Sequence, residues 1–315
     1  MTIKEIYNLA IQKGIEADFR PRVDIEKLLE RKRQKFEKLS EEEKKGFDQE
    51  SLTNPYSDTR ILHIADDKEI KKVLVGIDID VAEILLAKQL GNIDLVISHH
   101  PEGRALGDMH EVMDLQADKL RDAGVPIHVG EGLMKERMAE ISRIFSPKNL
   151  WRTIDAAKLL GINFMCMHTV ADNITAKAIE NAIKEKNPER VEDIMNILKT
   201  IGEFDQAIAR GAGPRIFVGS PENRTGKIFV GMTGGTEPSA KVFEKMSHAG
   251  IGTVVEMHVS EEHKKEAEAL HLNIVVTNHM PSDSIGMNLI LDDLEKQGVE
   301  IVPCGGLFRF SRARS

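Results

Sequence analysis

Histidines and carboxylates follow several predicted strands of this sequence, and their side chains suit a metal site. The adjacent pair His99 and His100 comes directly after a short apolar run, 94–98, and precedes Pro101. Proline ends strand pairing and holds the preceding residue extended, so both imidazoles should project from a fixed loop. Three other predicted strand ends carry further donors, namely His168 with Asp172, His258, and His279 with Asp283.

Imidazole nitrogens and carboxylate oxygens bind zinc, manganese, iron and similar divalent ions. One histidine at the end of one strand is more often a hydrogen-bonded structural residue. Four strand ends with such donors favour a metal site, provided that the fold brings them together.

The elements that must do so are short apolar strands alternating with helices from residue 61 onward. Strands are predicted at 72–78, 94–98, 126–129, 162–167, 215–218, 227–230, 253–258, 273–277 and 300–302. Helices are predicted at 81–90, 108–123, 133–145, 150–160, 173–210, from 236, at 260–270 and at 285–297. This alternation predicts an α/β fold with mainly parallel sheets covered by helices. Such sheets bind ligands at the carboxyl ends of their strands, where the histidines lie.

A faint internal repeat aligns 73–78, a helix and 95–99 with 228–233, a helix and 254–258. It predicts two similar βαβ-containing halves with the metal site in the cleft between them. We divide the chain into a helical N-terminal extension (1–60), a first α/β half (61–172), a helical connection (173–212) and a second α/β half (213–315). The charge-dense run 30–45 favours a solvated helical hairpin over a functional arm.

The composition limits the classes of partner. Of the 315 residues, 41% are hydrophobic and only 4% aromatic, and the net charge is −8. Few aromatic residues and an acidic balance argue against a broad nucleic-acid surface. Two cysteines without a CxxC pair, no apolar run near the ~18 residues of a membrane helix, and no signal-peptide pattern predict a cytoplasmic protein that does not bind membranes.

The motifs Ser98-His99-His100-Pro101, His168-Thr169-x-x-Asp172 and His279-x-x-x-Asp283 resemble those of the Ngg-one-interacting factor three family. The resemblance covers roughly 61–305, including the strand at 76–78 and the turn at 234–236. It implies a dinuclear metal protein that assembles into a homo-oligomer, a ring-like hexamer in family members. Some members carry the label "GTP cyclohydrolase I type two homologue".

By position, the resemblance implies that two divalent ions are bound by His99, His100, Asp172, His279 and Asp283. The family usually has glutamate where this chain has Asp283, which is one methylene shorter. A family T-G-E segment near 257–259 is lost, so His258 is a substitute ligand, a general acid or a structural residue. The N-terminal helices and the stretch 102–151 look like additions to the family pattern.

Two divalent ions held by three neutral histidines and two aspartates would leave a positive cleft, which suits a small anionic substrate. Water between two metals becomes a nucleophile, because its pKa falls towards ~7. We therefore expect a hydrolase of phosphorylated or nucleotide-like small molecules. His168 and Asp78 are candidates for orienting a ligand or moving a proton, with structural roles open for each.

Two other functions stay open. The protein could be a non-catalytic metal-binding or regulatory partner that uses its charged helices as contact surfaces. It could also be a nucleotide-binding module that uses the glycines of 231–235, although a tight structural turn is favoured there because the run is not a phosphate-binding motif.

Overall fold

The computed structural model describes residues 1–313. Its helices are α1 (Ile3–Ala17), α2 (Arg22–Glu37), α3 (Glu41–Gly46), α4 (Val81–Leu90), α5 (Arg104–Gly107), α6 (Asp114–Asp122), α7 (Ile127–Phe145), α8 (Arg152–Leu160), α9 (Thr169–Lys186), α10 (Val191–Lys199), α11 (Gly202–Ala209), α12 (Val242–His248), α13 (Glu261–Ala269) and α14 (His279–Lys296), with 3-10 turns η1 (Gln49–Leu52) and η2 (Met109–Met113). Its strands are β1 (Thr59–His63), β2 (Lys72–Gly76), β3 (Leu95–Ser98), β4 (Phe164–Met167), β5 (Arg215–Val218), β6 (Lys227–Gly231), β7 (Ile251–Glu256), β8 (Asn273–Val276) and β9 (Glu300–Cys304).

The strands form two sheets with the same underlying topology. The first has the order β1-β4-β3-β2-β9 and the second β5-β8-β7-β6. The first sheet has four parallel strands (β4, β3, β2 and β9) and the second has three (β8, β7 and β6), and each carries an antiparallel strand at one edge, β1 beside β4 and β5 beside β8. The expected α/β fold with mainly parallel sheets is therefore confirmed, and β1–β4 correspond to β5–β8. Strand β9, last in the sequence, returns to pair with β2 of the first sheet.

The strand registers correct the alignment of the repeat by one residue. Gly76 pairs with Ser98 in the first sheet, and Gly231 pairs with Glu256 in the second. Ser98 therefore corresponds to Glu256, and His100, not His99, corresponds to His258.

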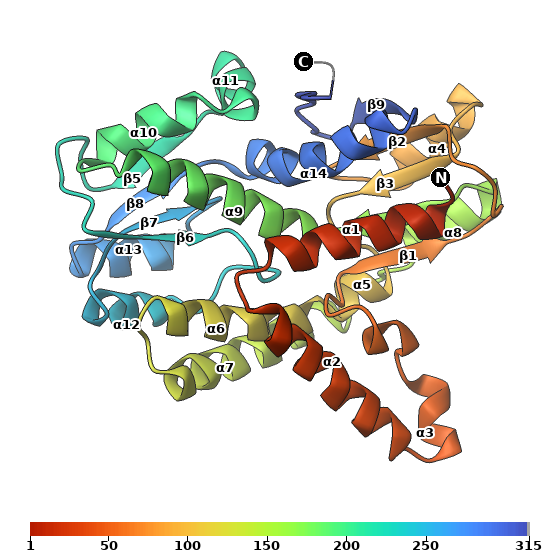
Figure 1. Cartoon of the computed structure of the whole chain (residues 1–315), viewed down its shortest axis with the longest axis horizontal. Helices are drawn as coiled ribbons and strands as arrows, with labels where there is room; N and C mark the ends of the chain where they lie inside the picture. Colours follow the sequence, from red (N-terminus) through yellow and green to blue (C-terminus); the bar gives the residue numbers. More distant parts are fainter. Residues whose placement is uncertain (314–315) are drawn as a thin grey trace.

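Helices α9 and α14 run between the two sheets (Figure 1). They are antiparallel, because Thr175 of α9 contacts Ser282 while Ala171 lies against Gly286. A Cβ atom at Gly286 would lie only 2.0 Å from the Ala171 carbonyl oxygen, so the close crossing requires glycine. Each helix packs partly on each sheet, and α1 covers α9. This crossing brings the start of α9, which follows β4, close to the start of α14, which follows β8.

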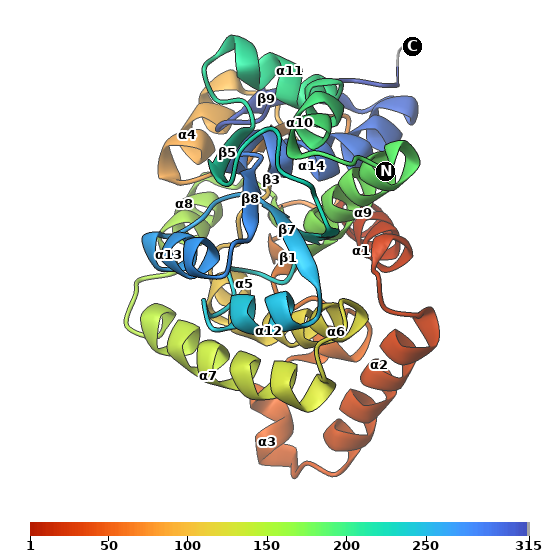
Figure 2. The ribbon, with the colours of Figure 1, turned by 90° about the vertical axis from the view of Figure 1, so that its left-hand side faces the viewer.

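The outer faces of the sheets are covered differently. Helices α4 and α8 pack on the first sheet, and α12 and α13 on the second. Helices α6 and α7, which follow β3, also join the second core (Figure 2). The Gln116 side-chain amide of α6 donates to the carbonyl oxygens of Gly234 (2.8 Å) and Thr236 (2.7 Å). A segment of the first half therefore covers the second.

Three predicted elements differ from the structure, and strand β1, which begins within the extension predicted as helical (1–60), was not predicted. Residues 126–129, predicted as a strand, are the N-cap residue Pro126 and the first turn of helix α7, because a short apolar run does not distinguish strand from helix. Helix α12 begins at Val242 rather than 236, after a loop. Helix α14 begins at His279 rather than 285, since Pro281 is tolerated in a first turn that needs no N–H partner there.

The N-terminal extension is helical as predicted, and α2 with α3 projects from the body (Figures 1 and 2). None of the helices within residues 1–313 is long and apolar enough to cross a membrane.

Candidate metal centre

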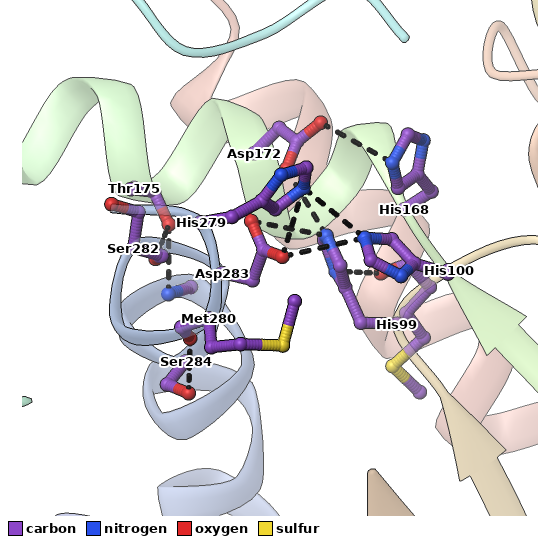
Figure 3. A network of polar contacts seen from close by, with 12 residues as sticks. His99, His100, His168, Asp172, Thr175, His279, Met280, Ser282, Asp283 and Ser284 are labelled. Carbon is purple, nitrogen blue, oxygen red and sulfur yellow. Dashed lines mark hydrogen bonds and ion pairs between the residues drawn. The ribbon is translucent and has the colours of Figure 1, made fainter. Parts of the chain in front are cut away.

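Six side chains converge at the carboxyl ends of β3 and β4 and the start of α14 (Figure 3). They form three overlapping groups whose donor atoms lie within 4.8 Å of one another. The groups are His99, Asp172 and Asp283; His100, His279 and Asp283; and His99, His100 and His168.

The loop after β3 fixes both of its histidines through their Nδ1 atoms. The Nδ1 of fully buried His99 lies 3.1 Å from the Met167 carbonyl oxygen, and the Nδ1 of His100 lies 2.6 Å from Asp78 Oδ1. Because each Nδ1–H donates to an oxygen, each Nε2 keeps its lone pair for the centre. Metal-binding histidines are oriented in this way.

The two central helices supply the other four donors at matching positions. His168 immediately precedes α9 and His279 begins α14, and each is followed four residues later by an aspartate. The Nδ1 of His168 donates to buried Asp58 Oδ2 at 2.8 Å. A helix places residues i and i+4 on one face, so His168 and Asp172 point together, as do His279 and Asp283.

Asp283 lies in the middle and faces both sides. Its Oδ1 is 3.5 Å from His99 Nε2, which is also 3.4 Å from Asp172 Oδ1. Its Oδ2 is 3.4 Å from His100 Nε2 and from His279 Nε2. The two carboxylate oxygens therefore belong to two separate donor sets that share one residue.

Four donor atoms at the centre are buried and have no hydrogen-bond partner among the described residues: His99 Nε2, Asp172 Oδ1, and both oxygens of Asp283. An unpartnered buried polar atom costs about 1–3 kcal/mol, so a cluster of them needs an explanation. Cations held by the two donor sets would satisfy all four atoms. The donor set, nitrogen and oxygen without sulfur, fits divalent ions of the zinc, iron and manganese type.

Burial and mutual contacts shift the pKa values of several residues in the cluster. Burial lowers the pKa of His99 to about 4, and burial raises that of Asp172 to about 8. Burial also lowers the pKa of His100, but the negative charges of nearby Asp283 and Asp78 outweigh this and raise it to about 10. Burial opposes ionisation of Asp283, yet the surrounding His99 and His100 hold its pKa below the ordinary range. Protons take the place that a metal cation could fill.

His258 lies outside these groups, at the open side of the centre. Its side chain is 50% exposed, its ring centroid is 5.3 Å from that of His279, and its Nε2 is 3.7 Å from Glu237 Oε2. His168, predicted alongside it as a catalytic residue, is instead buried within the cluster, with Nε2 3.9 Å from Asp172 Oδ2. The structure thus brings the five predicted metal-binding residues together with His168 and sets His258 beside them.

A cavity opens from the centre into the second half. Its lining includes His168, Asp172, His279 and Asp283 of the centre together with Phe229, Phe243, Met246, Val254 and Glu256 of the second half. The turn at Gly234 and Gly235 packs against Gln116 of α6 and Val112 of η2. Both glycines have φ near +90°, so the turn itself needs them.

Sequence reasoning missed Asp58 and Glu256. Asp58 precedes a strand, and only the antiparallel direction of β1 puts that end beside the carboxyl ends of β3 and β4. Glu256 is the last residue of β7, and the predicted strand 253–258 placed it inside the strand, so that only His258 was considered as a donor at this strand end.

Comparison with solved structures identifies the fold. The structure of an NIF3 (Ngg-one-interacting factor three) superfamily protein from Sphaerobacter thermophilus is 27% identical, with a TM-score of 0.76, over 98% of this chain and 99% of that one. The reduced HcgD of Methanocaldococcus jannaschii shares the fold at 16% identity and a TM-score of 0.51, over 77% of this chain and 87% of that one. No protein-family model matches the sequence, and no curated protein does.

Proposed function

This chain has the fold of the NIF3 superfamily over nearly its whole length. On this basis we propose that the protein is a dinuclear metal-dependent hydrolase of small phosphorylated or nucleotide-like molecules. The observation that carries the proposal is the set of four buried, unpartnered donor atoms at the centre. Purely structural histidines and aspartates would be expected to have hydrogen-bond partners.

Under this proposal His99, Asp172 and Asp283 hold one ion, and His100, His279 and Asp283 hold the other. When bound, the two ions would supply a water of lowered pKa and polarise a phosphoryl oxygen. Asp78 and Asp58 orient His100 and His168 by accepting their Nδ1 protons. His168 is close enough to the first set to contribute as a further donor.

The open side of the centre is where a substrate would enter, and His258 lies there. Glu237 Oε2 lies 3.7 Å from His258 Nε2, so its carboxylate can form an ion pair with the protonated ring. In that position His258 could give a proton to a leaving group, the role of a general acid. We assign it this role rather than that of a metal ligand, because it belongs to none of the three donor groups.

The test is metal content combined with turnover. Protein purified without chelators is expected to hold about two divalent ions per chain and to hydrolyse members of a panel of phosphoesters and nucleotides, GTP included. Chelation should abolish turnover, and readdition of zinc, manganese or iron should restore it. A fully loaded protein without turnover on the whole panel would count against a hydrolase.

A non-catalytic metal-binding or regulatory protein is the second candidate, favoured by the exposed, charged helices α2 and α3 that project from the body. It predicts a stable partner that is lost when α2 and α3 lose their charges, and no turnover. We also propose self-association, which native mass measurement would test.

A further inference from the structure

The cavity beside the metal centre has an apolar lining with one buried acid in it. Phe229, Phe243, Met246 and Val254 supply most of the apolar surface. Helix α6 adds Gln116, Lys119 and Leu120 from the first half. A pocket lined mainly by apolar and aromatic side chains with a few polar groups is the usual form of a small-molecule site.

Glu256 is that acid. It is only 8% exposed, lines the cavity, and lies on the same face of β7 as Val254. Its Oε1 is fully buried, and no described residue forms a hydrogen bond with it. Burial, with Glu237 nearby, raises the pKa of Glu256 to about 8.

The strand end itself does not require an acid. The corresponding residue of the first half is Ser98, whose hydroxyl is satisfied by donating to the carbonyl oxygen of His100. Glu256 has no such local partner, although an unpartnered buried polar atom costs about 1–3 kcal/mol. A bound ligand is the simplest source of the missing partner.

The ligand must match both the acid and the rest of the lining. A neutral carboxyl group offers one O–H donor beside one C=O acceptor, so it pairs in the plane with a group that offers an acceptor beside an N–H. The aromatic rings of Phe229 and Phe243 suit a flat partner. A cationic ring is disfavoured because the Lys119 ammonium lies 5.9 Å from the Phe229 ring centre.

We propose that Glu256 determines specificity for a flat, uncharged nitrogen heterocycle. The heterocycle offers Glu256 a hydrogen-bond acceptor beside an N–H donor, as the edge of a cyclic amide does. The anionic arm of the same molecule then faces the metal centre at the mouth of the cavity. The orientation of the anionic arm toward the metal centre rests on the proposed function. The inference adds the chemical class of the substrate to that function.

The test compares probes that differ only at this edge. Inosine 5′-monophosphate carries a carbonyl beside an N–H, purine riboside 5′-monophosphate lacks both, and ribose 5-phosphate lacks the ring. Their affinities for the metal-loaded protein are measured by calorimetry. The wild-type protein is expected to bind the inosine compound about tenfold or more tighter than the purine riboside compound.

Two substitutions separate hydrogen bonding from shape. Glu256→Gln retains a donor beside an acceptor, so it should keep most of the preference, within about threefold. Glu256→Leu fills the apolar space without polar atoms and should abolish the preference, while ribose 5-phosphate binds all three proteins equally. Phe229→Ala should weaken both ring compounds alike, and it provides a second readout if the leucine variant does not fold.

Equal affinity of the two ring compounds for the wild-type protein, or a preference that survives Glu256→Leu, would overturn the inference. Because affinity needs no turnover, its failure differs from failure of the proposed function. If the metal-loaded protein prefers the inosine compound but hydrolyses nothing, the Glu256 site is supported and the hydrolase function is refuted. If it hydrolyses members of the panel without this preference, the hydrolase function is supported and the Glu256 site is refuted.

Discussion

The two halves of the molecule supply the same donors from their helices but different residues from their strand ends. Helices α9 and α14 each begin beside a histidine and carry an aspartate four residues later, His168 with Asp172 and His279 with Asp283. After β3, however, the first half has His99 and His100, whereas the corresponding residues of the second are Met257 and His258. Only the first half therefore adds imidazoles to the cluster from the loop after this strand. The second half uses the corresponding end of β7 to line a cavity. A repeated fold can therefore assign metal binding to one copy and substrate binding to the other.

The largest effect on metal affinity is expected from substitution of Asp172 and Asp283, the aspartates that the two halves supply from equivalent helix positions. Asp283 faces both donor sets and Asp172 only one. Asp283→Asn should therefore lose both ions, with affinity falling by roughly 100-fold or more, since even residues behind the ligands contribute ~10–100-fold. Asp172→Asn should lose one ion. Elemental analysis measures both, and equal losses in the two variants would contradict the asymmetric sharing.

The helix crossing offers the next comparison. Gly286→Ala would put a Cβ atom 2.0 Å from the Ala171 carbonyl oxygen, so α9 and α14 must separate and carry Asp172 away from Asp283. We expect lower metal affinity and a loss of about 1–3 kcal/mol of unfolding free energy, as for other overpacked sites. The matched control is Gly132→Ala in helix α7, where nothing lies within 4 Å, and which should stabilise by ~0.5–1 kcal/mol. Denaturant unfolding with and without metal distinguishes the two. A Gly286→Ala variant with normal metal content would show that the crossing does not set the spacing.

Substitution of Asp78 tests whether only the first half uses its strand-end loops to bind metal. It accepts the Nδ1 proton of His100, whereas the corresponding residue of the second half is Thr233, which bonds to Asn173. Asp78→Asn should lower metal affinity ~10–100-fold, as is usual for a residue that orients a metal-binding histidine. Thr233→Val should leave metal affinity nearly unchanged. Competition with a fluorescent chelator measures both, and similar effects would refute the assignment of metal binding to the first loop.

The smallest expected effect is on pH dependence. In the metal-free protein the raised pKa values, about 10 for His100 and about 8 for Asp172, mean that the folded state holds protons which the unfolded chain has released. Stability from these groups is therefore greatest at low pH. The contribution of Asp172 is lost as pH rises from about 4 to 8 and that of His100 from about 6.5 to 10, so both fall together between about 6.5 and 8. Metal must displace the same protons, so its stabilising effect should grow over that interval. Thermal unfolding with and without metal should diverge as pH rises, and parallel curves would contradict this.

The sequence predicted the metal-type donors better than their surroundings. The strand before His99 and His100 was recognisable because an apolar run met two histidines and a proline. His279 and Asp283 were selected because they follow a predicted strand and match the spacing of the family motif. The start of α14 was missed since Pro281 lies within its first turn. Asp58 could not be found, because its place depends on β1 running antiparallel to β4, a long-range pairing that no local pattern encodes. Glu256 was missed for a similar reason, since the cavity that it lines is formed partly by helix α6 from the other half.

Helix α6 also bears on how such a protein could change over time. It belongs to a segment between β3 and α8, yet it forms a wall of the cavity over the second sheet and binds the turn at Gly234 through Gln116. An insertion or deletion in this segment could alter which molecules the cavity accepts while leaving the six central side chains in place. Catalytic potential and substrate choice would then be inherited as separable traits, so relatives with the same centre need not share a substrate.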